Sequence, residues 1–169
     1  LQSLGIELRV QQGVQVSRID HQNCFFFSLM SFIYEVASDL QAALLMFLYN
    51  SGARASEAVN LRVRDIAVGD GMRSALVTIR GKGKKTRVCP LWDSTVKLLQ
   101  PSLGRNPDEP VFLNRYGNPI TRYGVYEMVS RYAAKAAEIM PSIGDKNISP
   151  HTIRHSTASH LPEAGVDIN

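Results

Sequence analysis

The chain reads RSALVTIRGKGKKTRVCP over residues 73–90, and this segment shows that it is not purely helical. Apolar side chains occupy alternate positions of residues 75–79, which is the period of a half-buried strand. The glycines and lysines of residues 81–85 predict a turn, and residues 86–89 predict a second strand that Pro90 ends. The sequence therefore predicts an antiparallel β-hairpin with a basic tip.

Helical patterns dominate the chain on both sides of the hairpin. Apolar residues recur at the helical period after Asp39 and after Thr121. Ser38 or Asp39 can cap the first of these helices, and Thr121 can cap the second. Residues 149–150, a serine and a proline, begin a last helix, which we expect to kink or end near Leu161 because Pro162 follows. The expected helices cover residues 39–51, 54–60, 94–99, 121–140 and 149–161. The predicted fold class is α+β and mainly helical, with a small antiparallel sheet at one edge.

The length and composition are those of a single globular domain. The chain has 169 residues, 44% of them hydrophobic and 20% charged, which excludes a disordered or fibrous protein. We place the domain at residues 38–169 and treat residues 1–37, whose pattern is weak, as a separate segment. No apolar run reaches the length of about 18 residues that a membrane span needs. Two cysteines, Cys24 and Cys89, make no disulfide framework, and no export signal is visible, so we expect a cytoplasmic protein.

Positive charge is concentrated in the last two thirds of the chain. Residues 51–169 hold 17 basic and 11 acidic residues, whereas residues 1–50 hold two and four. This asymmetry points to an anionic partner, with nucleic acid as the first candidate. A solvated surface with an excess of lysine and arginine fits the same count, so charge alone does not decide between the two.

The segment SPHTIRH at residues 149–155 carries the strongest chemical pattern. His151 and Arg154 are three residues apart, so on a helix they share a face close to its N-terminus. Unpaired N–H groups and the positive end of the helix dipole lie at that terminus. An imidazole, a guanidinium and a helix N-terminus at one point suit a phosphate, although many surface helices carry such a pair without a function.

Two further groups are candidates for the same kind of site. Arg54 and Glu57 lie three residues apart in a predicted helix, where the carboxylate can orient the guanidinium and leave its other edge for an anion. Lys82 occupies the exposed hairpin tip, from which a flexible hairpin can swing it into a site. The ordinary alternatives are a helix-surface salt bridge and a solvated turn. Residues 81–86 are not a P-loop, because the glycine spacing is wrong and a strand follows.

The order and spacing of these blocks resemble the catalytic domain of the tyrosine recombinases, the phage integrase family. The matching segments are GARASEA at 52–58, TIRGKGKKTRVCPL at 78–91, VFLN at 111–114, ISPHTIRHS at 148–156 and EAGVD at 163–167. The resemblance covers residues 39–169 and leaves residues 1–37 outside. It implies a site-specific recombinase or integrase that binds double-stranded DNA, works as a homo-tetramer on paired DNA sites, and needs no metal, nucleotide or other cofactor.

The resemblance also assigns roles to residues of this chain. In this family a tyrosine attacks a DNA phosphate, forms a 3′-phosphotyrosyl link and releases a 5′-hydroxyl; the 5′-hydroxyl of a second strand then attacks that link. The two catalytic arginines that neutralise the phosphate oxygens match Arg54 and Arg154. The catalytic lysine that protonates the leaving 5′-oxygen matches Lys82, and the catalytic histidine that assists proton transfer matches His151. Glu57 matches the acidic residue that supports the first arginine. We expect Lys84, Lys85 and Arg87 to bind DNA.

The sequence departs from the family pattern after its last matching block. A Gly-His pair, a further His or Trp and then the nucleophilic tyrosine should follow Asp167, and none of the six tyrosines here matches that nucleophile. We therefore expect the chain as given not to cleave DNA by the covalent route. The alternatives are a non-catalytic DNA-binding fragment or remnant of a recombinase and, as a third class, a scaffold whose arginines only form salt bridges.

A metal site is a further hypothesis that the sequence leaves incomplete. His151 and His155 are four residues apart, and His21 and Cys24 form another pair with ligand spacing. Neither pair has a complete ligand set, so we expect no metal.

Overall fold

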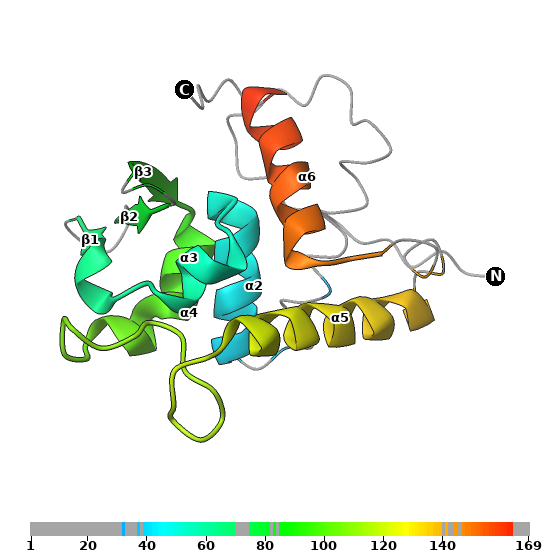
Figure 1. Cartoon of the computed structure of the whole chain (residues 1–169), viewed down its shortest axis with the longest axis horizontal. Helices are drawn as coiled ribbons and strands as arrows, with labels where there is room; N and C mark the ends of the chain where they lie inside the picture. The colour runs from blue at the N-terminus through cyan, green and yellow to red at the C-terminus, as the bar shows by residue number, and fades with distance from the viewer. Residues whose placement is uncertain are drawn as a thin grey trace.

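The computed structural model describes residues 32, 37, 39–69, 75–81, 83, 85–139, 141, 144 and 147–163. Within these residues a group of helices packs beside a small sheet that lies at one edge (Figure 1). This arrangement confirms the predicted fold class, which is α+β and mainly helical. No helix in the described part of the chain has the length and apolar character that crossing a membrane requires.

The helices and strands follow one another in a simple order. They are α2 (Asp39–Ser51), α3 (Ala55–Val59), the short 3-10 helix η1 (Val63–Asp65), β1 (Ile66–Val68), β2 (Ala75–Arg80), β3 (Thr86–Leu91), α4 (Asp93–Leu103), α5 (Arg122–Ile139) and α6 (Pro150–Glu163).

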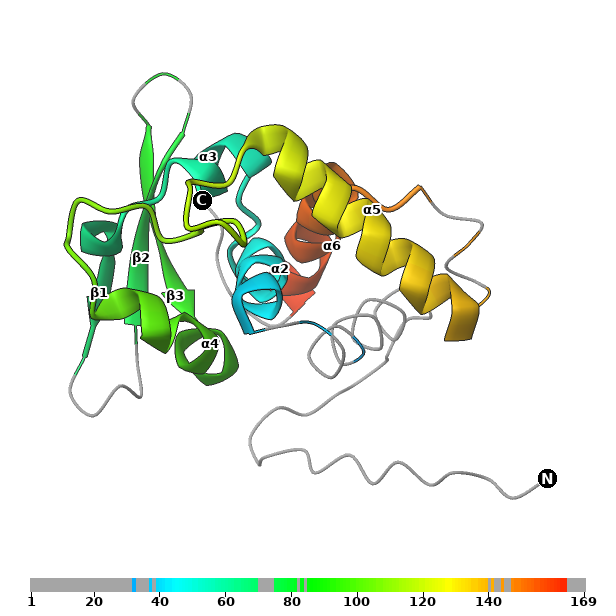
Figure 2. The ribbon, with the colours of Figure 1, turned by 90° about the horizontal axis from the view of Figure 1, so that it is seen from below.

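The sheet contains the predicted hairpin and one additional strand. Strands β2 and β3 pair antiparallel, with Thr78 opposite Val88, and β1 pairs antiparallel with the other edge of β2 (Figure 2). The sequence did not predict β1, because three residues are too few to show a period. The expectation that Pro90 ends its strand was wrong: β3 continues through Pro90 to Leu91. Proline is tolerated there because β3 is an outer strand of this sheet.

Some helix termini agree with those expected from the sequence, whereas other helices are longer than expected. The Oγ1 of Thr121 accepts a hydrogen bond from the backbone N–H of Gly124 at 3.0 Å, which confirms the cap of α5. Helix α4 is longer than expected, since it runs from Asp93 to Leu103 and includes Pro101. Helix α6 contains Pro162 and ends at the next residue, two positions beyond the expected end.

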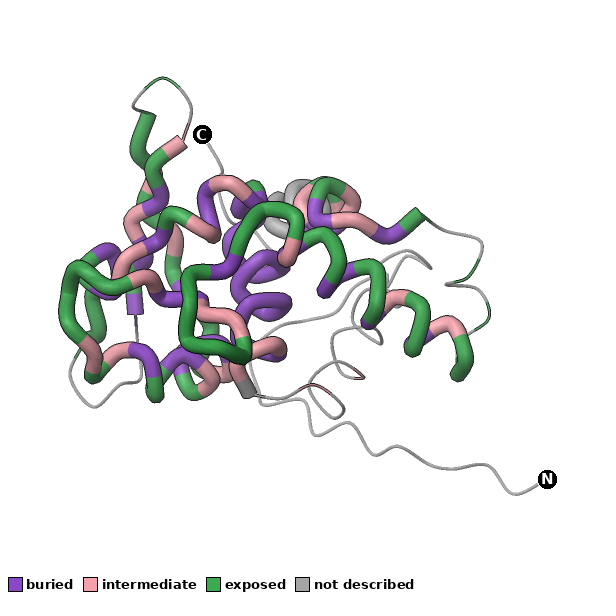
Figure 3. Tube along the Cα trace, turned by 60° about the horizontal axis from the view of Figure 1, so that its bottom comes forward, coloured by how far each residue is buried: buried purple, intermediate pink, exposed green. Residues whose placement is uncertain are grey.

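Helix α2 lies at the centre of the fold and is surrounded by other elements. All residues from 42 to 53 are buried, and α2 packs against α3, α4, α6 and β3 (Figure 3). A helix that is apolar on every side belongs in a core. The buried amide of Asn50 joins this helix to the sheet, donating to the carbonyl of Pro90 at 3.2 Å and accepting from the backbone N–H of Trp92 at 2.8 Å.

Helix α6 packs closely against the C-terminal end of α2. Gly52 has a φ of 58°, and a Cβ at this position would lie 3.3 Å from Cγ2 of Thr157 on α6. The Oγ1 of Thr157 donates a hydrogen bond to the carbonyl of Tyr49 at 2.7 Å. Gly52 therefore both terminates α2 and allows α6 to approach it closely.

Replacing Gly52 by alanine is expected to lower the free energy of unfolding by about 1–3 kcal/mol, because the left-handed backbone is strained for any side chain and the added Cβ would press on Thr157. Gly117→Ala is the matched control, since Gly117 has a φ of 77° with no atom near its Cβ position. Urea denaturation of both variants measures the difference. A cost for Gly52→Ala no larger than that for Gly117→Ala would show that the contact with Thr157 is unimportant.

Candidate functional site

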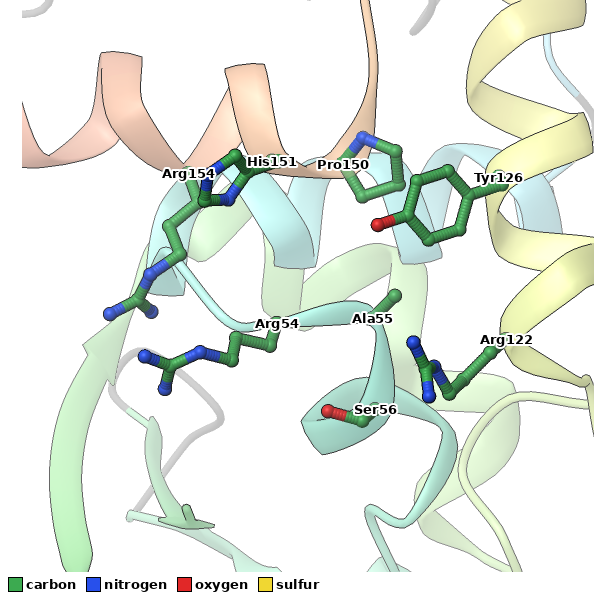
Figure 4. A pocket seen from close by; sticks show the side chains of 8 residues that line it. All are labelled: Arg54, Ala55, Ser56, Arg122, Tyr126, Pro150, His151 and Arg154. Atoms are coloured by element: carbon green, nitrogen blue, oxygen red, sulfur yellow. The ribbon is translucent and has the colours of Figure 1, made fainter. Parts of the chain in front are cut away.

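Arginines from three separate segments meet beside the start of α3. Arg54 directly precedes α3, Arg87 lies on β3, and Arg154 lies in the second turn of α6. Figure 4 shows the side chains of Arg54 and Arg154 extending toward the same side of the site. The structure therefore brings together two arginines that are 100 residues apart in the sequence.

Glu57 holds this cluster together. Its side chain is only 4% exposed; Oε1 accepts a hydrogen bond from Nη1 of Arg54 at 3.0 Å, and Oε2 accepts one from the Arg54 backbone N–H at 2.9 Å. Oε2 also accepts a hydrogen bond from Nη2 of Arg87 at 2.9 Å. Burial raises the pKa of Glu57, but hydrogen bonds from Arg87 and Arg54 and the positive charge of Arg87 outweigh it and lower the pKa overall. The carboxylate is thus ionised and orients both guanidinium groups.

Arg154 is held close to the other two positive charges. Its Nη1 donates a hydrogen bond to the carbonyl oxygen of Gly52. The pKa of Arg154 is lowered by burial first, and then by the positive charges of Arg54 and Arg87. Two guanidinium groups thus bond one carboxylate and a third lies close to them, which leaves an excess of positive charge. Such a cluster is suited to binding an anion with oxygen acceptors, such as a phosphate.

His151 lies in the first turn of α6, where the N-terminus of that helix is capped. The Oγ of Ser149 accepts a hydrogen bond from the backbone N–H of Thr152 at 3.2 Å, as the sequence predicted. The Nε2 atoms of His151 and His155 lie 3.1 Å apart, so one imidazole donates and the other accepts.

Among the described residues, the structure adds no further metal ligand to the pair His151 and His155. Within the described residues, no group of three His, Cys, Asp or Glu side chains is placed to hold a metal ion. His21 and Cys24, the other pair with ligand spacing, lie outside the described residues.

A pocket of about 120 Å³ opens beside the arginine cluster (Figure 4). The residues that line it come from the start of α3, from the first turns of α5 and from the start of α6: Arg54, Ala55, Ser56, Arg122, Tyr126, Pro150, His151 and Arg154. Three of the residues proposed from the sequence, Arg54, His151 and Arg154, therefore line one cavity. Glu57 does not line it but forms an ion pair with Arg54.

The hairpin tip is described only in part. Lys82 and Lys84 lie outside the described residues, whereas Lys85 is exposed and its carbonyl accepts a hydrogen bond from the Gly81 N–H at 2.7 Å. A Cβ at Gly81 would lie 3.2 Å from Oε1 of Glu57. The first residue of the hairpin turn thus lies against the carboxylate that organises the site.

Some residues of the site were missed by the sequence analysis. Arg87 was expected to contact DNA, and its hydrogen bond to Glu57 was not predicted. This bond joins two elements whose bonded residues are 30 positions apart, and no local sequence pattern indicates such a contact. Arg122 and Tyr126 are four residues apart on α5 and so share a face. That spacing was visible in the sequence, but nothing in it related this face to Arg54.

Comparison with known proteins gives consistent results. The model of the "Phage integrase family" matches residues 28–169. Tyrosine recombinase XerC of Pelobacter propionicus is 38% identical over 130 residues, which cover 75% of this chain and 40% of that protein. Tyrosine recombinase XerD of Corynebacterium glutamicum is 34% identical over 133 residues, with 75% and 40% covered. This chain therefore spans about 40% of the length of these relatives.

Solved structures share the fold. XerH site-specific recombinase bound to its difH substrate, in a pre-cleavage complex, matches with a TM-score of 0.69 at 23% identity, covering 83% of this chain and 42% of that one. The Tn1549 transposon integrase in complex with circular intermediate DNA matches with a TM-score of 0.65 at 21% identity, covering 85% and 54%. Because the family model covers most of the sequence and agrees with the motifs that converge in the pocket, the chain belongs to the phage integrase family.

Proposed function

We propose that this chain provides the phosphate-binding part of a tyrosine recombinase catalytic domain, which acts on double-stranded DNA in site-specific recombination or integration. One observation carries the proposal: two arginines, Arg54 and Arg87, bond the buried carboxylate of Glu57, and Arg154 lies close to both of them. The positive charges exceed the single negative charge, and Arg54 and Arg154 line a pocket. The domain extends over residues 38–169, and it acts in the cytoplasm. XerH and the Tn1549 integrase, which share this fold, were solved on DNA, which supports the choice of ligand.

In the reaction proposed for the intact protein, the oxygen of a tyrosine that is none of the six in this chain forms a bond to phosphorus while the bond from phosphorus to the 5′-oxygen breaks. Arg54 and Arg154 stabilise the charge that builds on the non-bridging oxygens. Lys82 donates a proton to the leaving 5′-oxygen, and His151 assists proton transfer. The phosphotyrosyl link retains the energy of the phosphodiester, so that a 5′-hydroxyl can attack it and rejoin a strand.

The remaining residues support this chemistry without reacting. Glu57 is a positioning residue, because it orients Arg54 and Arg87 through its two oxygens. Lys84 and Lys85 of the hairpin, together with Arg87, contact the DNA backbone. The assembly proposed for the intact protein is a homo-tetramer on DNA, and no metal or cofactor takes part.

Replacing Arg54 or Arg154 by alanine is expected to weaken DNA binding about tenfold, as expected for one lost charge-assisted hydrogen bond. Each change should also lower the slope of log affinity against log salt concentration by about one, since one phosphate contact is lost. Fluorescence anisotropy with a labelled DNA duplex at several salt concentrations measures both quantities.

Arg64→Ala is the matched control for this experiment. The side chain of Arg64 is 52% exposed and that of Arg54 is 55% exposed, but Arg64 pairs with Asp108 and does not line the pocket. We expect Arg64→Ala to bind DNA like the unaltered chain. Equal binding by all three variants would contradict the proposed function and favour a scaffold whose arginines serve only in salt bridges.

A further inference from the structure

The pocket has a second basic side that the proposed reaction does not use. Arg122 and Tyr126 line it from α5, and Figure 4 shows both side chains directed toward its middle from the side opposite Arg154. Ala55 and Pro150 lie between these two sides. The pocket therefore has a cationic group at each end and an apolar wall between them.

Arg122 differs from the other arginines because its guanidinium has no partner within the described residues. Each of the others there has a hydrogen bond, an ion pair or an aromatic ring: Arg54, Arg62, Arg64, Arg80, Arg87, Arg105, Arg115, Arg131 and Arg154. The hydroxyl of Tyr126 likewise has no hydrogen-bond partner in the described part of the chain, and the residue is 42% exposed. Two donors in one pocket are thus available to a ligand.

We propose that Arg122 and Tyr126 bind a second phosphate, next along the same DNA strand to the phosphate held by Arg54 and Arg154. A guanidinium binds a phosphate through two parallel hydrogen bonds, and a phenol adds one more donor. The deoxyribose that links two successive phosphates would lie against the apolar wall of Ala55 and Pro150. This inference rests on the proposed function, because it takes DNA to be the ligand of the pocket.

Binding of two phosphates has a consequence for the reaction. Contacts to a single phosphate allow the strand to pivot, whereas contacts to two successive phosphates fix its direction and register. Arg122 and Tyr126 would then be positioning residues, which place the reacting phosphate against Arg54 and Arg154.

The test compares pairs of variants on α5 in the anisotropy assay described above. Arg122→Ala is expected to lower the salt slope by about one, whereas Arg131→Ala, outside the pocket on the same helix, should leave it unchanged. Tyr126→Phe should weaken binding about three- to tenfold without changing the slope, since it removes one neutral donor. Tyr123→Phe is its control, because Tyr123 is 76% exposed and does not line the pocket. Thermal melting of each variant shows whether it is folded.

The double variant Arg54→Ala/Arg122→Ala distinguishes the binding of two phosphates from the binding of one. With two phosphates its salt slope should fall by about two, and with a shared phosphate it should fall no further than in either single variant. If the slope for the double variant falls no further than for a single variant, or if Arg122→Ala alone leaves the salt slope unchanged, the proposal of a second bound phosphate is wrong. The proposed function would still stand. If Arg54→Ala is also without effect, the proposed function fails as well.

Discussion

Replacing Glu57 by alanine is expected to lower the free energy of unfolding by about 2–3 kcal/mol. The carboxylate is buried and accepts three hydrogen bonds, all from Arg54 and Arg87. Removing one member of a buried ion pair costs about 3–5 kcal/mol. The loss here should be smaller, because the side chains of Arg54 and Arg87 are 55% and 37% exposed and regain water. Urea denaturation at neutral pH measures the change.

The same carboxylate makes stability depend on pH with a definite sign. The pKa of Glu57 is lower in the folded protein than its ordinary value, so the folded state favours the ionised form. Its contribution is therefore complete above the unfolded pKa of about 4.3, and it is lost as pH falls through the folded pKa. The difference in stability between the unaltered chain and Glu57→Gln should shrink as the solution is acidified.

Glu109→Gln is the control for this pH dependence. Glu109 is 49% exposed, and its Oε2 lies 4.0 Å from Nη1 of Arg105, so it forms only a weak surface pair. We expect its replacement to change stability by less than about 0.5 kcal/mol at any pH. A stability difference for Glu57→Gln that stays constant from neutral to strongly acidic pH would contradict the role given to Glu57.

Replacing Phe47 by alanine is expected to lower the free energy of unfolding by about 3–5 kcal/mol. Phe47 is fully buried on α2, and its ring centroid lies 5.3 Å from that of Phe112 in a tilted contact. The truncation would remove a large apolar side chain and leave a cavity where helices and loops meet. Because only Gly52 and Ala53 separate Arg54 from the end of α2, the loss should also disorder the candidate site. Urea denaturation and the DNA anisotropy assay check both effects.

Two other substitutions define how this result is interpreted. Phe47→Leu keeps most of the apolar volume and should cost much less than Phe47→Ala. Leu76→Ala shortens a residue that is 49% exposed on the outer face of the sheet, so a change within about 0.5 kcal/mol is expected. If Phe47→Ala were as mild as Leu76→Ala, α2 would not be the centre of the core.

The sequence predicted the elements whose signals are local. The hairpin followed from alternating apolar residues around a glycine-rich turn, and α5 from its helical period and the Thr121 cap. Strand β1 was missed because it has only three residues. The continuation of β3 through Pro90 depends on which strand is outermost, and that is decided by the pairing of the strands.

The amino-acid order alone indicated the family and the class of fold, and it singled out Arg54, Glu57, His151 and Arg154 as candidate site residues, since each motif lies within one or two helical turns. The tertiary structure alone decided that Arg87 shares the carboxylate of Glu57, and that Arg122 and Tyr126 face the same pocket as Arg154. The physical reason is that a periodic pattern specifies which face of an element is buried but not its neighbour. Packing of α3, α5, α6 and the hairpin around α2 makes that choice, and it creates the excess of positive charge on which the proposed binding of phosphate depends.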